Sequence, residues 1–453
     1  MAKGETAAAE PRGSQPMRAG GARHDRLREF IGSDGLLGMT SSLVVSQVLT
    51  SGLGLAFWIA AARTLSATDV GRLAAATSAM NLIATFAALG VGTMLIAELQ
   101  RATESERGAM FSTGMLTAAC AGAGLGLLLV IALASHSTSL AYLEADVATA
   151  AVFVVGSAAT SVAAAFVLAV LGFKRGRAQL LQNALASGLR LPVFLGLASL
   201  GLRAPGFALF AWVVTLVASL LLAIPLLPRG AVTFALVGTL SRRSLIQRHW
   251  HQSWDHHRVN LALTAPGLLL PLIAAFLLTP AQVAHFAVAN LIVGALLAVP
   301  YFLSVGLFAA GAADLHHLRA RMRQTLPLGV GAGVVIAVGL LISSGLILQV
   351  FGASYATGGA FALRTMALAA IPMVIKDHYI AMRRSQSRVG WAARATLIGG
   401  ACEIVAAFVG CRFWGVEGLC VGWVAALVVE ALALAVPLLS FLRGVGLAAG
   451  DSR

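Results

Sequence analysis

The sequence predicts an all-α membrane protein whose 12 transmembrane helices form two six-helix bundles, as 6+6 parallel repeats, around a central cavity. Three observations predict this fold class. The 453 residues are 58% hydrophobic and 11% charged, which excludes an ordinary soluble domain. The apolar runs have the length of about 20 residues that a helix needs to cross a bilayer. The two halves of the chain also resemble each other at a shift of about 213 residues.

The helices follow from apolar runs that are separated by charged, Gly or Pro positions. Each half contributes six. The predicted ranges are 36–61, 72–97, 108–134, 146–171, 178–200 and 206–227 in the first half, and 259–279, 282–311, 325–350, 359–382, 388–411 and 415–441 in the second.

The segments outside the helices are polar or basic. We expect a disordered basic cytoplasmic tail over 1–34, an N-terminal bundle over 35–227, a C-terminal bundle over 259–441 and a short cytoplasmic tail over 442–453. The linker over 228–258 interleaves Arg with Trp and predicts an amphipathic helix on the inner leaflet. Its four histidines leave a metal site open as an alternative, but they lack companion carboxylates or cysteines. These are His249, His251, His256 and His257.

The net charge of +14 does not indicate nucleic-acid binding, because the basic residues punctuate apolar runs. Most of the Lys and Arg residues fall in the tails, the linker and alternate loops, whereas Arg63, Arg72, Arg203 and Arg412 lie in the opposite loops. Positive charge gathers on the cytoplasmic side of membrane proteins. The pattern predicts a multi-pass protein of the bacterial plasma (inner) membrane with both termini in the cytoplasm.

The internal repeat is clearest at the turn between the first and second helix of each half. LSATDVGRLAAA, which begins at Leu65, aligns with LTPAQVAHFAVA, which begins at Leu278. Near the end of each half, AIPLL from Ala223 aligns with AVPLL from Ala435. Six helices in each half make the two repeats parallel, an arrangement that suits a transporter with a cavity between its halves.

Two segments and the 6+6 layout carry a resemblance to a known family. They are ARTLSATDVGRLAAATSAMNLIATFAALGVGTMLIAEL (62–99) and HHRVNLALTAPGLLLPLIAAFLLTPAQVAHFAVANLI (256–292). The chain resembles the multidrug/oligosaccharidyl-lipid/polysaccharide (MOP) exporter superfamily, and within it the O-antigen type polysaccharide flippases of actinobacteria. The resemblance spans residues 36–441. We expect no counterpart of the two extra C-terminal helices of the lipid II flippases, which argues against a peptidoglycan precursor as the substrate.

Ionisable groups inside the predicted helices are the first candidates for function, because each costs about 2.5–3.5 kcal/mol on insertion scales. Arg190, Glu403 and Glu430 lie near the middle of the fifth, eleventh and twelfth helices. Arg190 aligns with Cys402 at the repeat shift, so we expect Arg190 and Glu403 to have similar depth and to pair. Such a pair would either hold the bundle together or act on the substrate or gate.

The tenth helix carries Lys376, Asp377 and His378 in succession. Neighbouring residues on a helix point about 100° apart, so these three side chains cannot all face one partner. We expect Lys376, with Arg190 and Arg394, to bind substrate. Asp377, Glu403 and Glu430 are the candidates for coupling or gating, through a proton or a sodium ion.

The resemblance implies that the first two helices of each half line the central cavity. Amides and hydroxyls there suit sugar hydroxyl groups, which both donate and accept hydrogen bonds. The alternative is a role in hydrogen bonding between helices. The remaining candidates for substrate binding are Arg63 and Arg72 at the outer mouth, with Gln47, Asn81, Asn260, His285 and Asn290 along the helices.

The resemblance implies a flippase that moves a polyprenyl-diphosphate-linked oligosaccharide from the cytoplasmic to the outer leaflet, by alternating access, for cell-surface polysaccharide biosynthesis. Its partners would be the membrane, the lipid-linked saccharide and the glycosyltransferases or polymerase of the same pathway. No cofactor, metal or nucleic acid is expected.

Two alternatives remain open. A cation-coupled multidrug exporter of the same superfamily would need a deep carboxylate in the first half, where Glu98 lies only at a helix end. A membrane glycosyltransferase or polysaccharide polymerase would need a large catalytic loop. The outer loop over 135–145 offers only His136 and Glu144.

Overall fold

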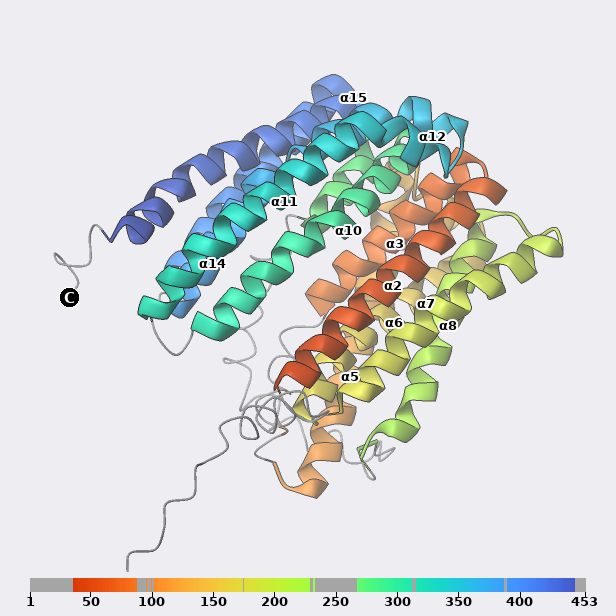
Figure 1. Ribbon diagram of the computed structural model, residues 1–453. Helices are drawn as coiled ribbons and strands as arrows, with labels where there is room; N and C mark the ends of the chain where they lie inside the picture. The colour runs from red at the N-terminus through yellow and green to blue at the C-terminus, as the bar shows by residue number, and fades with distance from the viewer. Residues whose placement is uncertain are drawn as a thin grey trace, which may run out of the picture. The chain divides into compact units, whose positions relative to one another are not determined.

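The computed structural model describes residues 36–87, 102–173, 175–228, 267–311, 315–386 and 389–444, with a few isolated positions between them. All regular structure in these ranges is helical (Figure 1), which confirms the predicted all-α class. Seven of the described helices are long and apolar enough to cross a membrane. The chain is therefore a multi-pass membrane protein in its described part.

The first half forms helices close to the predicted ranges. Asp146 begins one of them by accepting a hydrogen bond from the Thr149 amide, and Pro205 supplies a favourable first residue for another. The helices are α2 (Leu36–Thr64), α3 (Ala67–Ala87), α5 (Glu104–Ala132), α6 (Val147–Gly172), α7 (Gly176–Ser199) and α8 (Pro205–Ala223), with the short 3₁₀ helices η1 (Ala134–His136), η2 (Ala141–Glu144) and η3 (Ile224–Leu226).

The second half departs from the prediction at one segment. The single helix predicted over 359–382 is wrong, because the chain there forms two successive helices, Ala360–Ala367 and Ala370–Ser385. Gly359 separates the first of these helices from a short preceding helix, Ala353–Gly358, and Pro372 has no amide to bond the carbonyl of Leu368 at the break between the two. The helices are Gly267–Leu277, α10 (Pro280–Gly311), α11 (Leu315–Gln349), α12 (Ala353–Gly358), α13 (Ala360–Ala367), α14 (Ala370–Ser385) and α15 (Val389–Arg443).

A break divides α15 where the sequence predicts two helices. Trp414 and Gly415 have non-helical backbone angles, and Gly415 has φ 62° and ψ −143°. Glycine adopts this left-handed backbone without a steric penalty. The two segments of α15, 389–413 and 416–443, correspond to the eleventh and twelfth predicted helices.

The two aligned turns of the repeat have the same hydrogen-bond pattern. In the first half, the Ser66 hydroxyl accepts a bond from the Asp69 amide and donates to its carboxylate. In the second half, the Thr279 hydroxyl accepts a bond from the Gln282 amide and donates to its side-chain oxygen. Both are capping pairs at a helix N-terminus, and they differ by the repeat shift of 213 residues.

The helices that follow these turns pack directly against each other. α3 and α10 are in contact, and Gly71 lies so close to the Pro280 carbonyl that any Cβ at residue 71 would overlap it. Nearby, the Ser137 hydroxyl donates to the Ala275 carbonyl. The halves therefore meet tightly at the end that the charge pattern predicts to be outside.

The buried core of the described residues has one large cluster and three smaller ones. The large cluster contains residues of both halves at the predicted outer end, such as Phe57, Val70, Phe286 and Tyr355. At the opposite end, Phe111 and Phe166 belong to a cluster made only of first-half residues. A separate cluster over 318–441 is made only of second-half residues. The described cores thus join the halves at one end and separate them at the other.

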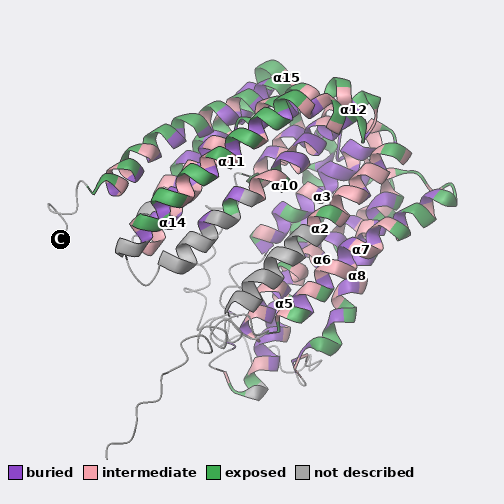
Figure 2. Cartoon of the chain, viewed as in Figure 1, coloured by how far each residue is buried: buried purple, intermediate pink, exposed green. Residues whose placement is uncertain are grey.

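The outward faces of several helices are apolar and uncovered. On α11, Val335, Ile342 and Leu346 share one face and are 72%, 78% and 70% exposed. Figure 2 shows such exposed stretches along α11 and α15. Soluble proteins rarely expose a continuous apolar surface of this kind to water. A bilayer accepts it, as the hydropathy of the chain predicts.

Several predictions lie outside the described residues. They concern the tail over 1–34, most of the linker over 228–258 with His249, His251, His256 and His257, the Asn260 site, and most of the tail over 442–453. Gln47 lies on α2, but its side chain is outside the described part. The division into bundles over 35–227 and 259–441 stays a prediction.

Candidate functional site

Arg190 lies on α7 with its guanidinium against aromatic rings. Its Cζ atom is 3.4 Å from the centroid of the Trp212 ring on α8 and 5.8 Å from that of Phe57 on α2. Phe57 packs edge-on against Trp212, with 5.4 Å between the ring centroids. We call these three residues the Arg190 site. The rings provide a desolvated cation–π surface, worth about 2 kcal/mol.

The charge of Arg190 is not neutralised by a carboxylate in the described part of the chain. The side chain is buried, with 8% of its surface exposed, and its Nε atom has no hydrogen-bond partner among the described residues. The expected pairing of Arg190 with Glu403 is wrong, because Glu403 binds Lys376 and Trp423 instead. A buried cation of this kind is suited to hold an anion.

Lys376 on α14 connects the two carboxylates that the sequence singled out. Its Nζ atom lies 2.6 Å from Glu403 Oε1 and 2.9 Å from Glu430 Oε2. The Trp423 indole N–H donates to Glu403 Oε2 at 2.8 Å. We call these four residues the Lys376 cluster. All three of its charged residues are at least nine-tenths buried.

The backbone leaves space for one of these carboxylates. Gly399 lies one helical turn before Glu403, and a Cβ at residue 399 would overlap the Glu430 carboxyl group. Glycine at this position lets Glu430 come against the first segment of α15. The cluster thus depends on residues from α14 and from both segments of α15.

The two halves place opposite charges at corresponding positions. Arg190 and Glu403 are separated by the repeat shift of 213 residues, and each contacts a tryptophan of the next helix, Trp212 or Trp423. The tryptophan ring face meets the cation, whereas the tryptophan N–H meets the anion. Sequence reasoning missed both tryptophans and Gly399. The similar spacing of the two tryptophans was the available signal.

The neighbours of Lys376 on α14 face other parts of the structure. Asp377 is half-buried and has no place in the Lys376 cluster. His378 is fully buried and lies 3.2 Å from the Ser304 hydroxyl and 3.3 Å from that of Thr325. The expectation that these three residues cannot share one partner is confirmed.

The predicted mouth arginines have protein partners in this structure. Arg63 donates to the carbonyls of Gln349 and Val350 at 2.7 and 2.8 Å, and so connects α2 with the end of α11. Arg72 forms an ion pair with Asp69 at 3.2 Å. Arg63 thus contributes to the contact between the halves at the predicted outer end, whereas the Arg72 ion pair lies within α3.

The other predicted residues are dispersed. His285 packs edge-on against Tyr355, with 5.3 Å between the ring centroids. Asn81 on α3 is exposed, Asn290 on α10 is half-buried, and Arg394 on α15 is exposed. The contact between α3 and α10 places the helices of both asparagines at the junction of the halves. Whether any of these residues binds substrate stays a prediction.

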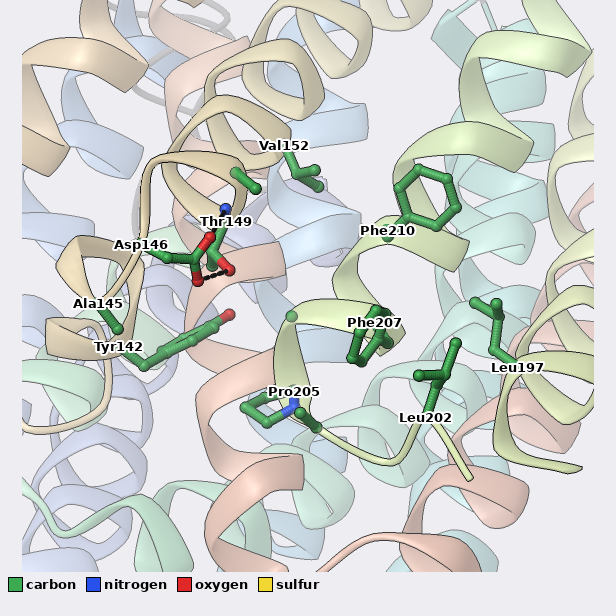
Figure 3. Close-up of a pocket in the computed structure, with 13 residues that line it drawn as sticks. Tyr142, Ala145, Asp146, Thr149, Val152, Leu197, Leu202, Pro205, Phe207 and Phe210 are labelled. Atoms are coloured by element: carbon green, nitrogen blue, oxygen red, sulfur yellow. Dashed lines mark hydrogen bonds between the residues drawn. The ribbon is translucent and has the colours of Figure 1, made fainter. Parts of the chain in front are cut away.

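A cavity of about 720 Å³ has no lining residue in common with the Arg190 site or the Lys376 cluster. It opens between η2, α6, α7 and α8, and its walls include Val152, Leu197, Phe207 and Phe210 (Figure 3). Its lining is mainly apolar, and Asp146, on its rim, already caps α6. This cavity therefore lacks charged groups free to bind a polar cargo.

Two titratable groups at this end lie outside the spans. Hydrogen bonds from Thr149 lower the pKa of Asp146, and burial raises the pKa of Tyr142. The loop over 135–145 packs Leu140 and Leu143 into the core. Among the described residues, no cluster of three or more His, Cys, Asp or Glu side chains could hold a metal ion.

Comparisons with known proteins agree with this geometry. Residues 36–239 match the family model of polysaccharide biosynthesis proteins. A lipid II flippase, MurJ, in an inward closed conformation is similar in structure, with a TM-score of 0.67, 10% identity, and coverage of 90% of this chain and 89% of that one. No curated protein sequence matches the chain.

Multidrug transporters show the same similarity. A MATE family transporter of the MOP superfamily in an inward-facing conformation has a TM-score of 0.62 at 16% identity, over 91% of this chain and 96% of that one. The chain has the MOP superfamily fold. A mutant of the MATE transporter VcmN of Vibrio cholerae matches with a TM-score of 0.56 at 15% identity, over 90% and 98% of the two chains.

The family model and the structural matches cover different parts of the chain. The family model covers the part of the chain that contains the Arg190 site. The structural matches cover both halves and the junction between them. The resemblance to this superfamily, drawn from 62–99 and 256–292, is confirmed at the level of the fold.

Proposed function

We propose that the chain is a flippase that moves a polyprenyl-diphosphate-linked oligosaccharide from the cytoplasmic to the outer leaflet of the bacterial plasma membrane. The buried guanidinium of Arg190 carries this proposal, because it has no carboxylate partner among the described residues. A diphosphate supplies the missing negative charge. The match of residues 36–239 to polysaccharide biosynthesis proteins supports a saccharide cargo.

The proposed mechanism is alternating access between two six-helix halves of a 12-helix chain, around a central cavity. The large shared core and the Arg63 contacts close the predicted outer end. The separate cores at the other end leave each half free to move there. The cargo would enter from the cytoplasm, with its phosphates at Arg190 and its prenyl chain in lipid.

The energetics of this transport do not require a second ion. Outward movement of negative charge from a negative interior is favourable by about 2.3 kcal/mol per charge per 100 mV. Arg190 offsets part of the cost of bringing the phosphates into a low dielectric. Its planar guanidinium can donate two parallel hydrogen bonds to phosphate oxygens while it lies against the Trp212 ring.

The multidrug alternative predicts a different charge at the binding site. A lipophilic cation needs a carboxylate that it can reach, but Glu403 and Glu430 are buried against the ammonium group of Lys376. In the first half, Asp69 pairs with Arg72, and Asp146 caps α6. The described charges therefore favour an anionic cargo.

The test is deletion of the gene in its bacterium, followed by lipid extraction and complementation. We expect a prenyl-linked oligosaccharide to accumulate on the inner leaflet. Wild-type chain and Arg203→Ala, which changes an exposed arginine of the same half, should clear it. Arg190→Ala should slow clearance at least tenfold while inserting normally. Normal surface glycans in the deletion strain, or export of lipophilic cations that depends on the chain but not on Arg190, would refute the proposal.

A further inference from the structure

The Lys376 cluster contains more negative than positive charge. Glu403 and Glu430 both contact the single ammonium group of Lys376, so the cluster has a net charge of −1 when both carboxyl groups are ionised. Their side chains are 5% and 7% exposed. An uncompensated charge at such depth is costly. One more positive charge would make the cluster neutral.

The second carboxyl oxygen of Glu430 is the position in the cluster where a positive charge could bind. Glu430 Oε1 is buried and has no hydrogen-bond partner among the described residues. Gly399 lets this carboxyl group lie against the α15 backbone, and the shared contact with the Lys376 ammonium group brings the Glu403 carboxylate close to it. Two carboxyl groups can share a hydrogen bond only when one of them carries a proton.

We propose that the Lys376 cluster is a proton-binding site and that Glu430 takes up and releases the proton. The protonated Glu430 carboxyl donates its O–H to the Glu403 carboxylate, while Lys376 keeps its ammonium group. Release of the proton returns the cluster to a charge of −1. This inference goes beyond the proposed function and does not depend on the cargo.

The geometry favours a proton over a metal cation. The Lys376 ammonium already occupies the place between the two carboxylates. The Trp423 N–H takes a further oxygen of Glu403. A sodium-like cation needs several oxygen ligands at once, whereas a proton needs one donor oxygen and one acceptor.

The other charged groups on α14, α15 and the helices that pack against α15 contact other residues or are partly or fully exposed. Asp377 follows Lys376 on α14 and is half-buried. On the helices that pack against α15, Arg364 of α13 donates to the Ser344 hydroxyl at 2.7 Å. Arg319 of α11 lies over the Phe441 ring, and Arg323 donates to the Leu442 carbonyl. Arg394 of α15 is exposed. Lys376 is therefore the cation that faces Glu430 in the described structure.

Infrared spectroscopy of the purified full-length chain in lipid nanodiscs tests the site directly. At low pH we expect the carbonyl band of a buried, protonated carboxylic acid, which disappears as the pH rises. Labelling the glutamates with ¹³C should shift this band in the unaltered chain. Glu430→Gln should remove it. Glu417→Gln, which changes an exposed carboxylate of the same helix, should retain it.

Two further outcomes decide the identity of the ion. Lys376→Met removes the ammonium, so the band should persist to higher pH, because ionisation then leaves the carboxylates without their cation. Sodium at constant ionic strength should leave the band unchanged. A band that does not shift with labelled glutamate, that survives Glu430→Gln, or that sodium abolishes would overturn the proposal. The labelled wild-type chain remains decisive if a variant does not fold.

Discussion

Gly399→Ala tests whether the Lys376 cluster depends on close packing of α15 against itself. The new methyl group would overlap the Glu430 carboxyl group. Ordinary contact between carbon atoms needs ~3.5 Å, so the carboxyl group must retreat by roughly 1 Å. The 2.9 Å contact from Lys376 to Glu430 then exceeds the length of a hydrogen bond. We expect a loss of about 1–3 kcal/mol in the free energy of unfolding, as for an overpacked core.

The measurement is denaturant or thermal unfolding of the full-length chain in detergent, with Gly339→Ala as the matched control. Gly339 lies on α11 with open space around its Cβ position, so that change should be neutral or stabilising by up to ~1 kcal/mol. In a Glu430→Asp background, whose shorter side chain relieves the overlap, Gly399→Ala should cost less. Equal stability of Gly399→Ala and Gly339→Ala would refute the reasoning.

Three other predictions follow from the predicted outer end. Arg63→Ala removes two hydrogen bonds between the halves and should reduce thermal stability by about 1–3 kcal/mol, with Arg63→Lys intermediate; unchanged melting would contradict it. Ser66→Ala and Thr279→Ala each remove one capping hydroxyl and should cost about 1 kcal/mol each; a cost at only one site would contradict their equivalence. The lowered pKa of Asp146 means that its cap stabilises the fold above the unfolded pKa of about 3.9 and is lost as pH falls through the lower folded value; Asp146→Asn should remove that part of the acid dependence.

Much of the fold could be predicted because hydrophobic periodicity and charge placement are local properties of the sequence. The break near Trp414 was predicted from the Gly and charged positions there. The division of 359–382 into two helices was not predicted, because one proline does not show in advance how neighbouring helices accommodate the break. Gly71 similarly revealed its contact with Pro280 only in three dimensions.

The candidate charges could be found from the sequence, but their partners could not. Depth in an apolar run identified Arg190, Lys376, Glu403 and Glu430 as costly to bury. Depth alone suggested the wrong pair, since it fixes the position along the bilayer normal and leaves the direction around the helix open. In the structure, Arg190 lies over the Trp212 ring, whereas Glu403 pairs with Lys376 and accepts from Trp423.

The predicted ion pair between Arg190 and Glu403, which the structure does not contain, bears on how the two halves could separate. An ion pair between Arg190 and Glu403 would join the two halves inside the membrane, and separating a buried pair costs about 3–5 kcal/mol. The described ion pairs instead stay within one half each. The arginine contact that does cross between the halves is that of Arg63 with backbone carbonyls, at an exposed position where water can replace each bond at about 0.5–1.5 kcal/mol. Ion pairs that stay within one half and weak polar contacts at the outer end suit the proposed alternating-access cycle, in which the two bundles would separate there.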